Sequence, residues 1–251
     1  MSTNRPFTLS IAGFDPSAGA GVLADIKTFE QHQVYGLAIN TANTIQTENN
    51  FLAIDWTRID FILQSIETLF RTYNIKAVKI GVVSSLENLT QIVSLIKNIS
   101  PETKIVWDTV LKSTTEFDFL SIKNQKVLIA ILDKIEVITP NYNEILKLNT
   151  SENSAEKIAK KLSQHCNVFL KGGHHPTEKG TDYLYLKNEI INLTPKNTTI
   201  FPKHGSGCVL SAAITANLSL DQDLLLACQN AKKYTENFLS STPSQLGHHY
   251  V

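Results

Sequence analysis

Residues 7–45 are FTLSIAGFDPSAGAGVLADIKTFEQHQVYGLAINTANTI, and this stretch decides the fold class. The apolar run over 7–12 that stops at Gly13 is typical of a buried strand. Apolar residues spaced three and four apart then predict a helix over 20–33, and a second strand pattern covers 35–45. A strand, a helix and a strand in this order predict a βαβ unit and therefore a parallel sheet.

The same alternation continues along the chain. Further strands are predicted over 77–80, 105–107, 137–139 and 168–170, and further helices over 56–73, 86–96, 122–132, 155–162, 208–218 and 224–239. The segments 182–186 and 189–193, joined through Lys187 and Asn188, instead predict a hairpin. We therefore expect one α/β domain over 1–251, with a mostly parallel central sheet, helices on both faces and an antiparallel hairpin at one edge.

Composition limits the class of protein. Among 251 residues 42% are apolar and 18% charged, which is enough for a sizeable core, and the formal net charge of zero disfavours nucleic-acid or membrane-surface partners. Three cysteines disfavour a disulfide framework and favour a reducing compartment. The first seven residues lack the apolar core of a signal peptide, and no apolar run approaches the ~18 residues of a membrane span. These features predict a soluble, cytoplasmic protein.

Chemically useful residues follow the predicted strands. They are residues 13–21, Gln46, Gly81, Asp108 with Thr109, Pro140 with Asn141 and then Glu144, and residues 171–174. Ligands of open α/β sheets bind beyond the carboxyl ends of the strands, so these positions should meet at one edge. Turn formation explains any one of them, but six in succession favour a binding site.

The segment His204-Gly205-Ser206-Gly207-Cys208 leads directly into a predicted helix. Its glycines allow close backbone approach, and a helix N-terminus offers free N–H groups and a positive dipole end. Together these features predict an anion site suited to a phosphoryl group. Taken alone, the pattern also fits a plain glycine-rich loop in which Ser206 caps the helix.

In chain order, these motifs resemble those of the hydroxymethylpyrimidine/phosphomethylpyrimidine kinases, a ribokinase-like family. The matching segments are 12–21 (AGFDPSAGAG) with 24–29 (ADIKTF), 79–81 (KIG), 108–110 (DTV), 139–141 (TPN) with Glu144, 171–174 (KGGH), and 204–208 (HGSGC) with 211–213 (SAA). The resemblance spans almost the whole chain. Cys208 is especially informative, because most ribokinase-like enzymes carry aspartate there, although some relatives with this cysteine act on pyridoxal or pyridoxine.

The resemblance implies transfer of the γ-phosphoryl group of ATP, with Mg²⁺, to the hydroxymethyl oxygen of 4-amino-5-hydroxymethyl-2-methylpyrimidine. Many members phosphorylate the monophosphate again, which yields the diphosphate used to make thiamine diphosphate. The family also suggests a homodimer. The sequence leaves open whether one or both phosphorylations occur and which loop closes the site.

The resemblance also implies site residues. Those expected to line the pyrimidine pocket are Gly13, Asp25, Gln46 and Val82. An amide such as Gln46 can both donate to and accept from an aminopyrimidine edge. Asp25 could instead be a charge on a helix surface.

Asp108, Asn141 and Glu144 stand where the family handles Mg²⁺ and ATP phosphates, with Asp108 and Glu144 as metal ligands, possibly through water. Lys171 is expected to clamp phosphate, both in binding ATP and in catalysis. The alternatives are a surface helix residue for Glu144 and a solvated strand-end lysine for Lys171.

For Cys208 we expect a thiol pKa lowered by the helix N-terminus, so that the thiolate could accept the substrate proton. Alternatively, Cys208 mainly shapes the pocket while the amides of Gly205, Ser206 and Gly207 supply most of the catalytic stabilisation, since phosphoryl transfer needs little base assistance.

Two other functions remain open. A pyridoxal or pyridoxine kinase would act on a similar hydroxymethyl group on a nitrogen ring. A non-catalytic pyrimidine-binding protein is less favoured, because Lys171 and the glycines of 204–208 are present. Departures from the family pattern at Phe14, Thr47 and Val82 alter the rim of the pocket and bear on substrate range, and Ala18 replaces a usual glycine.

Overall fold

The computed structural model describes residues 5–112, 119–149, 152–175, 177–196 and 200–250. Its strands are β1 (Phe7–Phe14), β2 (Tyr35–Gln46), β3 (Phe51–Trp56), β4 (Ile75–Ile80), β5 (Lys104–Trp107), β6 (Val137–Ile138), β7 (Asn167–Leu170), β8 (Asp182–Tyr185) and β9 (Ile190–Leu193). Its helices are α1 (Gly21–Gln31), α2 (Ile59–Thr72), α3 (Leu86–Ile99), α4 (Gln125–Leu132), α5 (Tyr142–Leu148), α6 (Ala155–Leu162), α7 (Ser206–Ser219) and α8 (Leu224–Ser240), with a 3₁₀ turn, η1, at Gly172–His174.

The strands form one sheet in the order β3-β2-β1-β4-β5-β6-β7-β8-β9. The six strands from β2 to β7 in this order run parallel, whereas β3 pairs antiparallel at one edge and β8 and β9 do so at the other. The parallel strands therefore present their carboxyl ends along a single edge of the sheet, as the βαβ pattern predicts.

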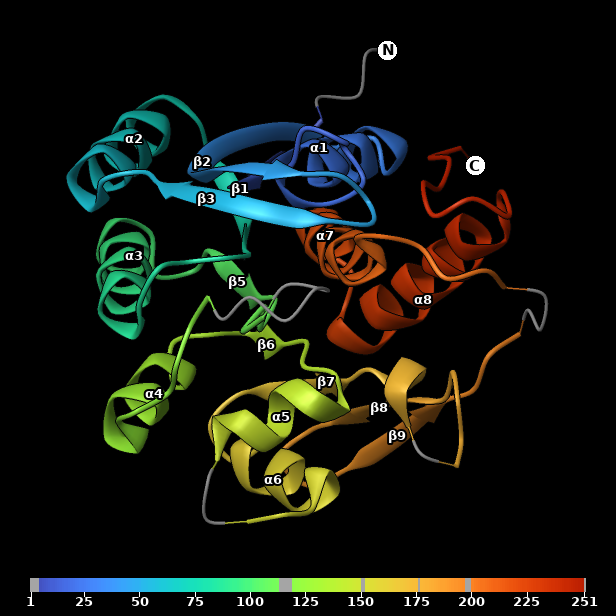
Figure 1. Ribbon diagram of the computed structural model, residues 1–251. Coiled ribbons are helices and arrows are strands. Elements are labelled where there is room, and N and C mark those ends of the chain that lie inside the picture. The colour runs from blue at the N-terminus through green and yellow to red at the C-terminus, as the bar shows by residue number, and fades with distance from the viewer. Residues whose placement is uncertain (1–4, 113–118, 150–151, 176, 197–199, 251) are drawn as a thin grey trace.

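Helices cover both faces of the sheet, with α2, α3 and α4 on one side and α7 and α8 on the other (Figure 1). Alternation along β5 shows the two layers: Ile105 and Trp107 join the core under α2 to α6, while Val106 joins the core under α7 and α8. Helix α1 packs on α7 through Phe29. The expected fold class is confirmed. In the described ranges, no helix has the length and apolar character required to cross a bilayer.

Four element predictions were wrong in detail. The strand β3 was missed, and the helix predicted from residue 56 begins at Ile59, because Trp56 continues the helical spacing although it pairs with Ala42 of β2. The short helix α5 was not predicted. Helix α4 begins at Gln125 instead of residue 122, because the side chain of Asn124 caps its N-terminus.

Candidate active site

The N-terminus of α7 opens at the carboxyl edge of the sheet. Gly205, its N-cap, has a left-handed φ of 73°, and residues 205–208 are partly exposed, whereas α7 is buried from Val209 onward. The first N–H groups of a helix have no carbonyl partner within that helix, and they carry its positive dipole end. This arrangement directs the first N–H groups and the positive dipole end of a buried helix toward the carboxyl edge of the sheet.

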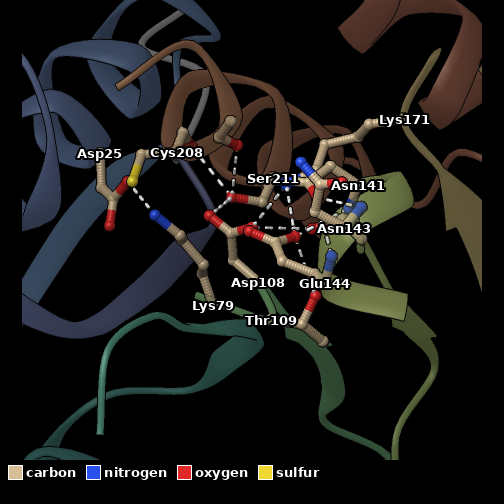
Figure 2. A network of polar contacts seen from close by, with 12 residues as sticks. Asp25, Lys79, Asp108, Thr109, Asn141, Asn143, Glu144, Lys171, Cys208 and Ser211 are labelled. Carbon is tan, nitrogen blue, oxygen red and sulfur yellow. Dashed lines mark hydrogen bonds and ion pairs between the residues drawn. The ribbon is translucent and has the colours of Figure 1, made fainter. Parts of the chain in front are cut away.

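Lys171 follows β7 and lies beside this helix end (Figure 2). A Cβ atom on Gly207 would lie 3.2 Å from Lys171 Nζ, which is itself 3.2 Å from Asp108 Oδ1 and 3.5 Å from Glu144 Oε2. Burial opposes the charged amine, yet the two carboxylates raise the pKa of Lys171 above its usual value. The ammonium of Lys171 therefore stands between two carboxylates and the N-terminus of α7, and Lys171 is not a solvated strand-end lysine.

Asp108 follows β5 and is 1% exposed. Its carboxylate accepts hydrogen bonds from Thr139 Oγ1 and Ser211 Oγ, each at 3.1 Å. Burial alone would raise its pKa, but Lys171 and Lys79 outweigh burial and lower it. Asp108 is thus a buried, ionised carboxylate held by three segments far apart in sequence.

Asn141 and Glu144 form the capping box of α5. Asn141 Oδ1 accepts from the backbone N–H of Glu144 at 2.9 Å, and Glu144 Oε2 accepts from the backbone N–H of Asn141 at 2.7 Å. Glu144 also accepts from Thr109 Oγ1 at 3.3 Å, and burial raises its pKa. Glu144 is therefore no surface charge, and Asn141 and Glu144 also have the structural function of capping α5.

The donor set limits the kind of metal site that this edge can form. Asp108 and Glu144 both pair with the ammonium of Lys171. Across the part of the chain with described placement, no three acidic, histidine or cysteine side chains gather as a metal cage. Mg²⁺ commonly keeps several waters and substrate phosphates as ligands. The residues fit a Mg²⁺ ion that is carried mainly by phosphates, and do not fit one enclosed by protein.

Cys208 contradicts the expected lowering of its pKa. Cys208 is partly exposed as a residue, yet the surrounding protein desolvates its thiol and raises the pKa of that thiol to about 11. Lys79 acts in the opposite direction, but Asp108 and Asp25 add to the increase. At neutral pH the thiol is therefore protonated.

Asp25 lies in a buried ion pair. Its carboxylate accepts from Lys79 Nζ and Ser10 Oγ, and both members of the pair are 0% exposed. Burial opposes the charge on Lys79, but the attraction of Asp25 raises the pKa of that ammonium. The pair lies beside Cys208 (Figure 2), so the alternative of a helix-surface charge at Asp25 is wrong.

Two other predicted pocket residues meet. A Cβ on Gly13 would lie 2.9 Å from Val82 Cγ1, so the ends of β1 and β4 converge there. Gln46 lies farther out, where it pairs with Phe51 in the β2–β3 hairpin beyond the last β1 contact at Asn43.

Several residues of this edge were not assigned to the site from sequence. They are Asp15, Lys79, Thr139, His204 and Ser211. Lys79 carried a usable signal, because a charged residue inside an otherwise apolar parallel strand needs a buried partner. All five stood inside quoted motifs, but the pairing of Asp15 with His204 depends on the fold.

A helix N-terminus beside a lysine paired with two carboxylates, at the carboxyl edge of a mostly parallel sheet, is typical of the ribokinase-like class of α/β phosphotransferases. Residues 15–251 match the phosphomethylpyrimidine kinase family, and the chain belongs to that family.

Individual relatives agree. A hydroxymethylpyrimidine/phosphomethylpyrimidine kinase of Aquifex aeolicus (strain VF5) is 33% identical, with 96% of this chain and 97% of that protein covered. The crystal structure of a phosphomethylpyrimidine kinase from Clostridium difficile 630 has a TM-score of 0.76 at 30% identity, covering 92% of this chain and 98% of that one. A Staphylococcus aureus pyridoxal kinase in complex with AMP-PCP and pyridoxal has a TM-score of 0.82 at 26% identity, covering 95% and 89%.

Proposed function

We propose that the protein transfers the γ-phosphoryl group of ATP to the hydroxymethyl oxygen of 4-amino-5-hydroxymethyl-2-methylpyrimidine, and then phosphorylates the monophosphate to the diphosphate for thiamine diphosphate synthesis. The observation that carries the proposal is the ammonium of Lys171, held by Asp108 beside the N-terminus of α7. The names of the relatives support this choice of substrate.

In this reaction the substrate hydroxymethyl oxygen forms a bond to the γ-phosphorus while the bond to the β-phosphate oxygen breaks and ADP leaves. The N–H groups of residues 205–208 and the ammonium of Lys171 bind the phosphoryl oxygens, whose charge they stabilise in the transition state. Mg²⁺ would neutralise part of the phosphate charge, with Asp108 and Glu144 as ligands, some through water.

The hydroxyl proton passes to an oxygen of the transferred phosphoryl group or to solvent, and a loose transition state needs little help from a base to release it. Because its pKa is about 11, the thiol of Cys208 is neutral at physiological pH. We therefore favour Cys208 as a wall of the pocket over Cys208 as a preformed thiolate base.

For the acceptor we propose a pocket bounded by Gly13 and Val82, with the Asp25–Lys79 pair beneath it and Gln46 contacting the pyrimidine from the β2–β3 hairpin. Since β3 is an edge strand that pairs only with β2, the β2–β3 hairpin is free to close over the acceptor. Gln46 on this hairpin would then contact the bound pyrimidine.

Pyridoxal phosphorylation is the second candidate. The pyridoxal kinase bound to pyridoxal superposes with a TM-score of 0.82, against 0.76 for the phosphomethylpyrimidine kinase. The fold is thus shared by kinases named for either acceptor, while identity of 33% over nearly the whole chain favours the pyrimidine.

A homodimer in the cytoplasm is also part of the proposal. Ile45 and Leu52 of the β2–β3 hairpin are 63% and 74% exposed, and exposed apolar side chains of this size suit a subunit contact. The three cysteines are free thiols, which fits a reducing compartment.

The test measures ADP release by purified protein with ATP and Mg²⁺, comparing hydroxymethylpyrimidine, its monophosphate and pyridoxal in parallel, with Lys171→Met as the control. Turnover of both pyrimidines with weaker pyridoxal turnover would establish the two-step kinase. A preference for pyridoxal would transfer the protein to the second candidate. No turnover of any acceptor by the wild type would overturn the proposed function and favour a binding protein.

A further inference from the structure

A buried acid–imidazole pair joins the two loops that meet at the N-terminus of α7. His204 Nε2 lies 2.8 Å from Asp15 Oδ2, and the two side chains are 7% and 2% exposed. Asp15 belongs to the loop between β1 and α1, whereas His204 directly precedes Gly205. A side-chain contact across 189 residues therefore connects the acceptor side of the site to its phosphoryl side.

Asp15 is also the main acceptor within its own loop. It accepts from the backbone N–H groups of Ser17 and Ala20, each at 2.9 Å, and from Ser17 Oγ at 2.8 Å. Burial opposes ionisation, but the hydrogen bond from His204 lowers the pKa of Asp15 below its usual value. The carboxylate is thus charged, and its oxygens are held in place by the loop.

The two loops touch without spare room. A Cβ on Gly205 would lie 2.0 Å from Gly19 O, and a Cβ on Gly19 would lie 2.7 Å from His204 Cδ2. The backbone N–H of His204 donates to Gln245 O at 2.9 Å. His204 is therefore held by its ring against the first loop and by its backbone against the C-terminal segment.

The other ring nitrogen of His204, Nδ1, is buried and has no hydrogen-bond partner among the described residues. With an ionised Asp15 as acceptor, the neutral tautomer places its proton on Nε2. The ring is therefore fixed in the site by this single side-chain hydrogen bond, and a replacement that keeps the donor should preserve its effect.

We propose that Asp15 and His204 are positioning residues, which set the N–H groups of residues 205–208 at the distance from the acceptor pocket that phosphoryl transfer requires. Neither side chain need touch the substrate; the pair acts through the backbone of Gly205. This inference rests on the proposed function for the reaction being measured. It adds two residues that align the acceptor side of the site with its phosphoryl side.

The test compares His204→Ala with His204→Gln. Misaligned donors stabilise the transition state poorly, while ground-state binding of the acceptor, which they do not contact, changes little. His204→Ala should therefore lower kcat about 30-fold and change the acceptor KM by less than about threefold. Glutamine keeps an N–H in place of Nε2–H, so His204→Gln should retain kcat within about threefold. Equal kcat for wild type and His204→Ala, or equal losses in both variants, would overturn the proposal.

A double-substitution cycle tests whether the pair acts as a unit. Asp15→Ala removes the acceptor and should lower kcat at least as much as His204→Ala does, and the double variant should be within about threefold of Asp15→Ala. Independent, multiplying losses would count against the pair. The control is Asp223→Ala, which removes the N-cap of α8 and lowers stability without touching the site, so its kcat should be unchanged.

Failure of the proposed function can be told apart from failure of this inference. If the wild type prefers pyridoxal, the ratios of variant to wild-type kcat and KM are measured with pyridoxal instead, because the anion-binding loop serves any acceptor. If the wild type phosphorylates no acceptor, the readout is the Kd of a non-hydrolysable ATP analogue. His204→Ala should then raise that Kd about tenfold and His204→Gln should not, and an unchanged Kd in both overturns the inference.

Discussion

A Cβ atom on Gly205 would lie 2.0 Å from the carbonyl oxygen of Gly19. The left-handed φ of Gly205 adds strain for any other residue, whereas a Cβ on Gly207 would meet only the flexible end of Lys171, at 3.2 Å. Gly205 is therefore required by its backbone conformation and its contact with Gly19. A side chain at Gly207 would be opposed only by Lys171.

We expect Gly205→Ala to displace the anion-binding loop, lowering kcat by at least about 100-fold and reducing Tm. Gly207→Ala should keep the wild-type Tm and lower kcat only about tenfold, because the ammonium shifts while the loop stays. Steady-state kinetics and thermal unfolding of both variants check this. Equal effects from the two substitutions would contradict it.

Lys171→Met removes the cation that compensates Asp108 and Glu144. We expect a loss of about 1,000-fold in kcat, since one charged donor to the transferred group is lost and two buried acids are left to repel phosphate. The control is Lys134→Met, an exposed lysine after α4 that contacts Ser94. If Lys171→Met retains more than about a tenth of wild-type kcat, the phosphate role of Lys171 is wrong.

The pKa of Cys208, about 11, predicts low thiol reactivity. Alkylation by iodoacetamide should be slow at pH 7.5 and should rise about tenfold per pH unit until the pH approaches that pKa, because only the thiolate reacts. Mass spectrometry distinguishes Cys208 from the buried Cys166 and Cys228. Rapid, pH-independent alkylation between pH 7 and 9 would show that the thiolate is preformed.

The same pKa predicts that Cys208→Ser retains kcat within about tenfold, since a neutral pocket wall is replaced by a similar group. A loss beyond about 1,000-fold with an unchanged acceptor KM would instead support the base role. The measurement is kcat and KM for both proteins across the same pH range.

Lys79→Met should destabilise the fold by about 3–5 kcal/mol, because it leaves the fully buried carboxylate of Asp25 without its cation. The double variant Asp25→Asn/Lys79→Met should be more stable than the sum of the single effects predicts, by more than about 1 kcal/mol, since it leaves neither member of the pair as an unpaired buried charge. Urea unfolding of the four proteins measures this cycle. Strict additivity would mean that the two side chains do not act as a pair.

Ala18 has a left-handed φ of 56°, as does Gln33 at the end of α1, with φ 57°. Glycine adopts this conformation freely, so Ala18→Gly should raise the free energy of unfolding by about 0.5–1 kcal/mol, the relief of strain being partly offset by the more flexible unfolded chain. Gln33→Gly should act in the same direction. A lower Tm for both variants would contradict this explanation.

The order of elements could be predicted from sequence because its signals are local. Apolar periodicity and a stop at Gly13 define the first strand within a few residues, and the alternation of strand and helix patterns defines a parallel sheet. Parallel strands place their carboxyl ends at one edge, so the meeting of Asp108 and Lys171 follows from the same pattern. The edge strand β3 escaped prediction because its conformation depends on pairing with β2.

The amino-acid sequence by itself therefore determined the α/β class, the edge where chemistry gathers and the family to which the motifs belong. Only the tertiary structure decided that Asp25 pairs with Lys79 across 54 residues, that Asp15 holds His204, and that the Cys208 thiol is neutral. The physical reason is that desolvation and ion pairing depend on atoms from segments distant in the chain, and local propensity carries no information about which segments those are.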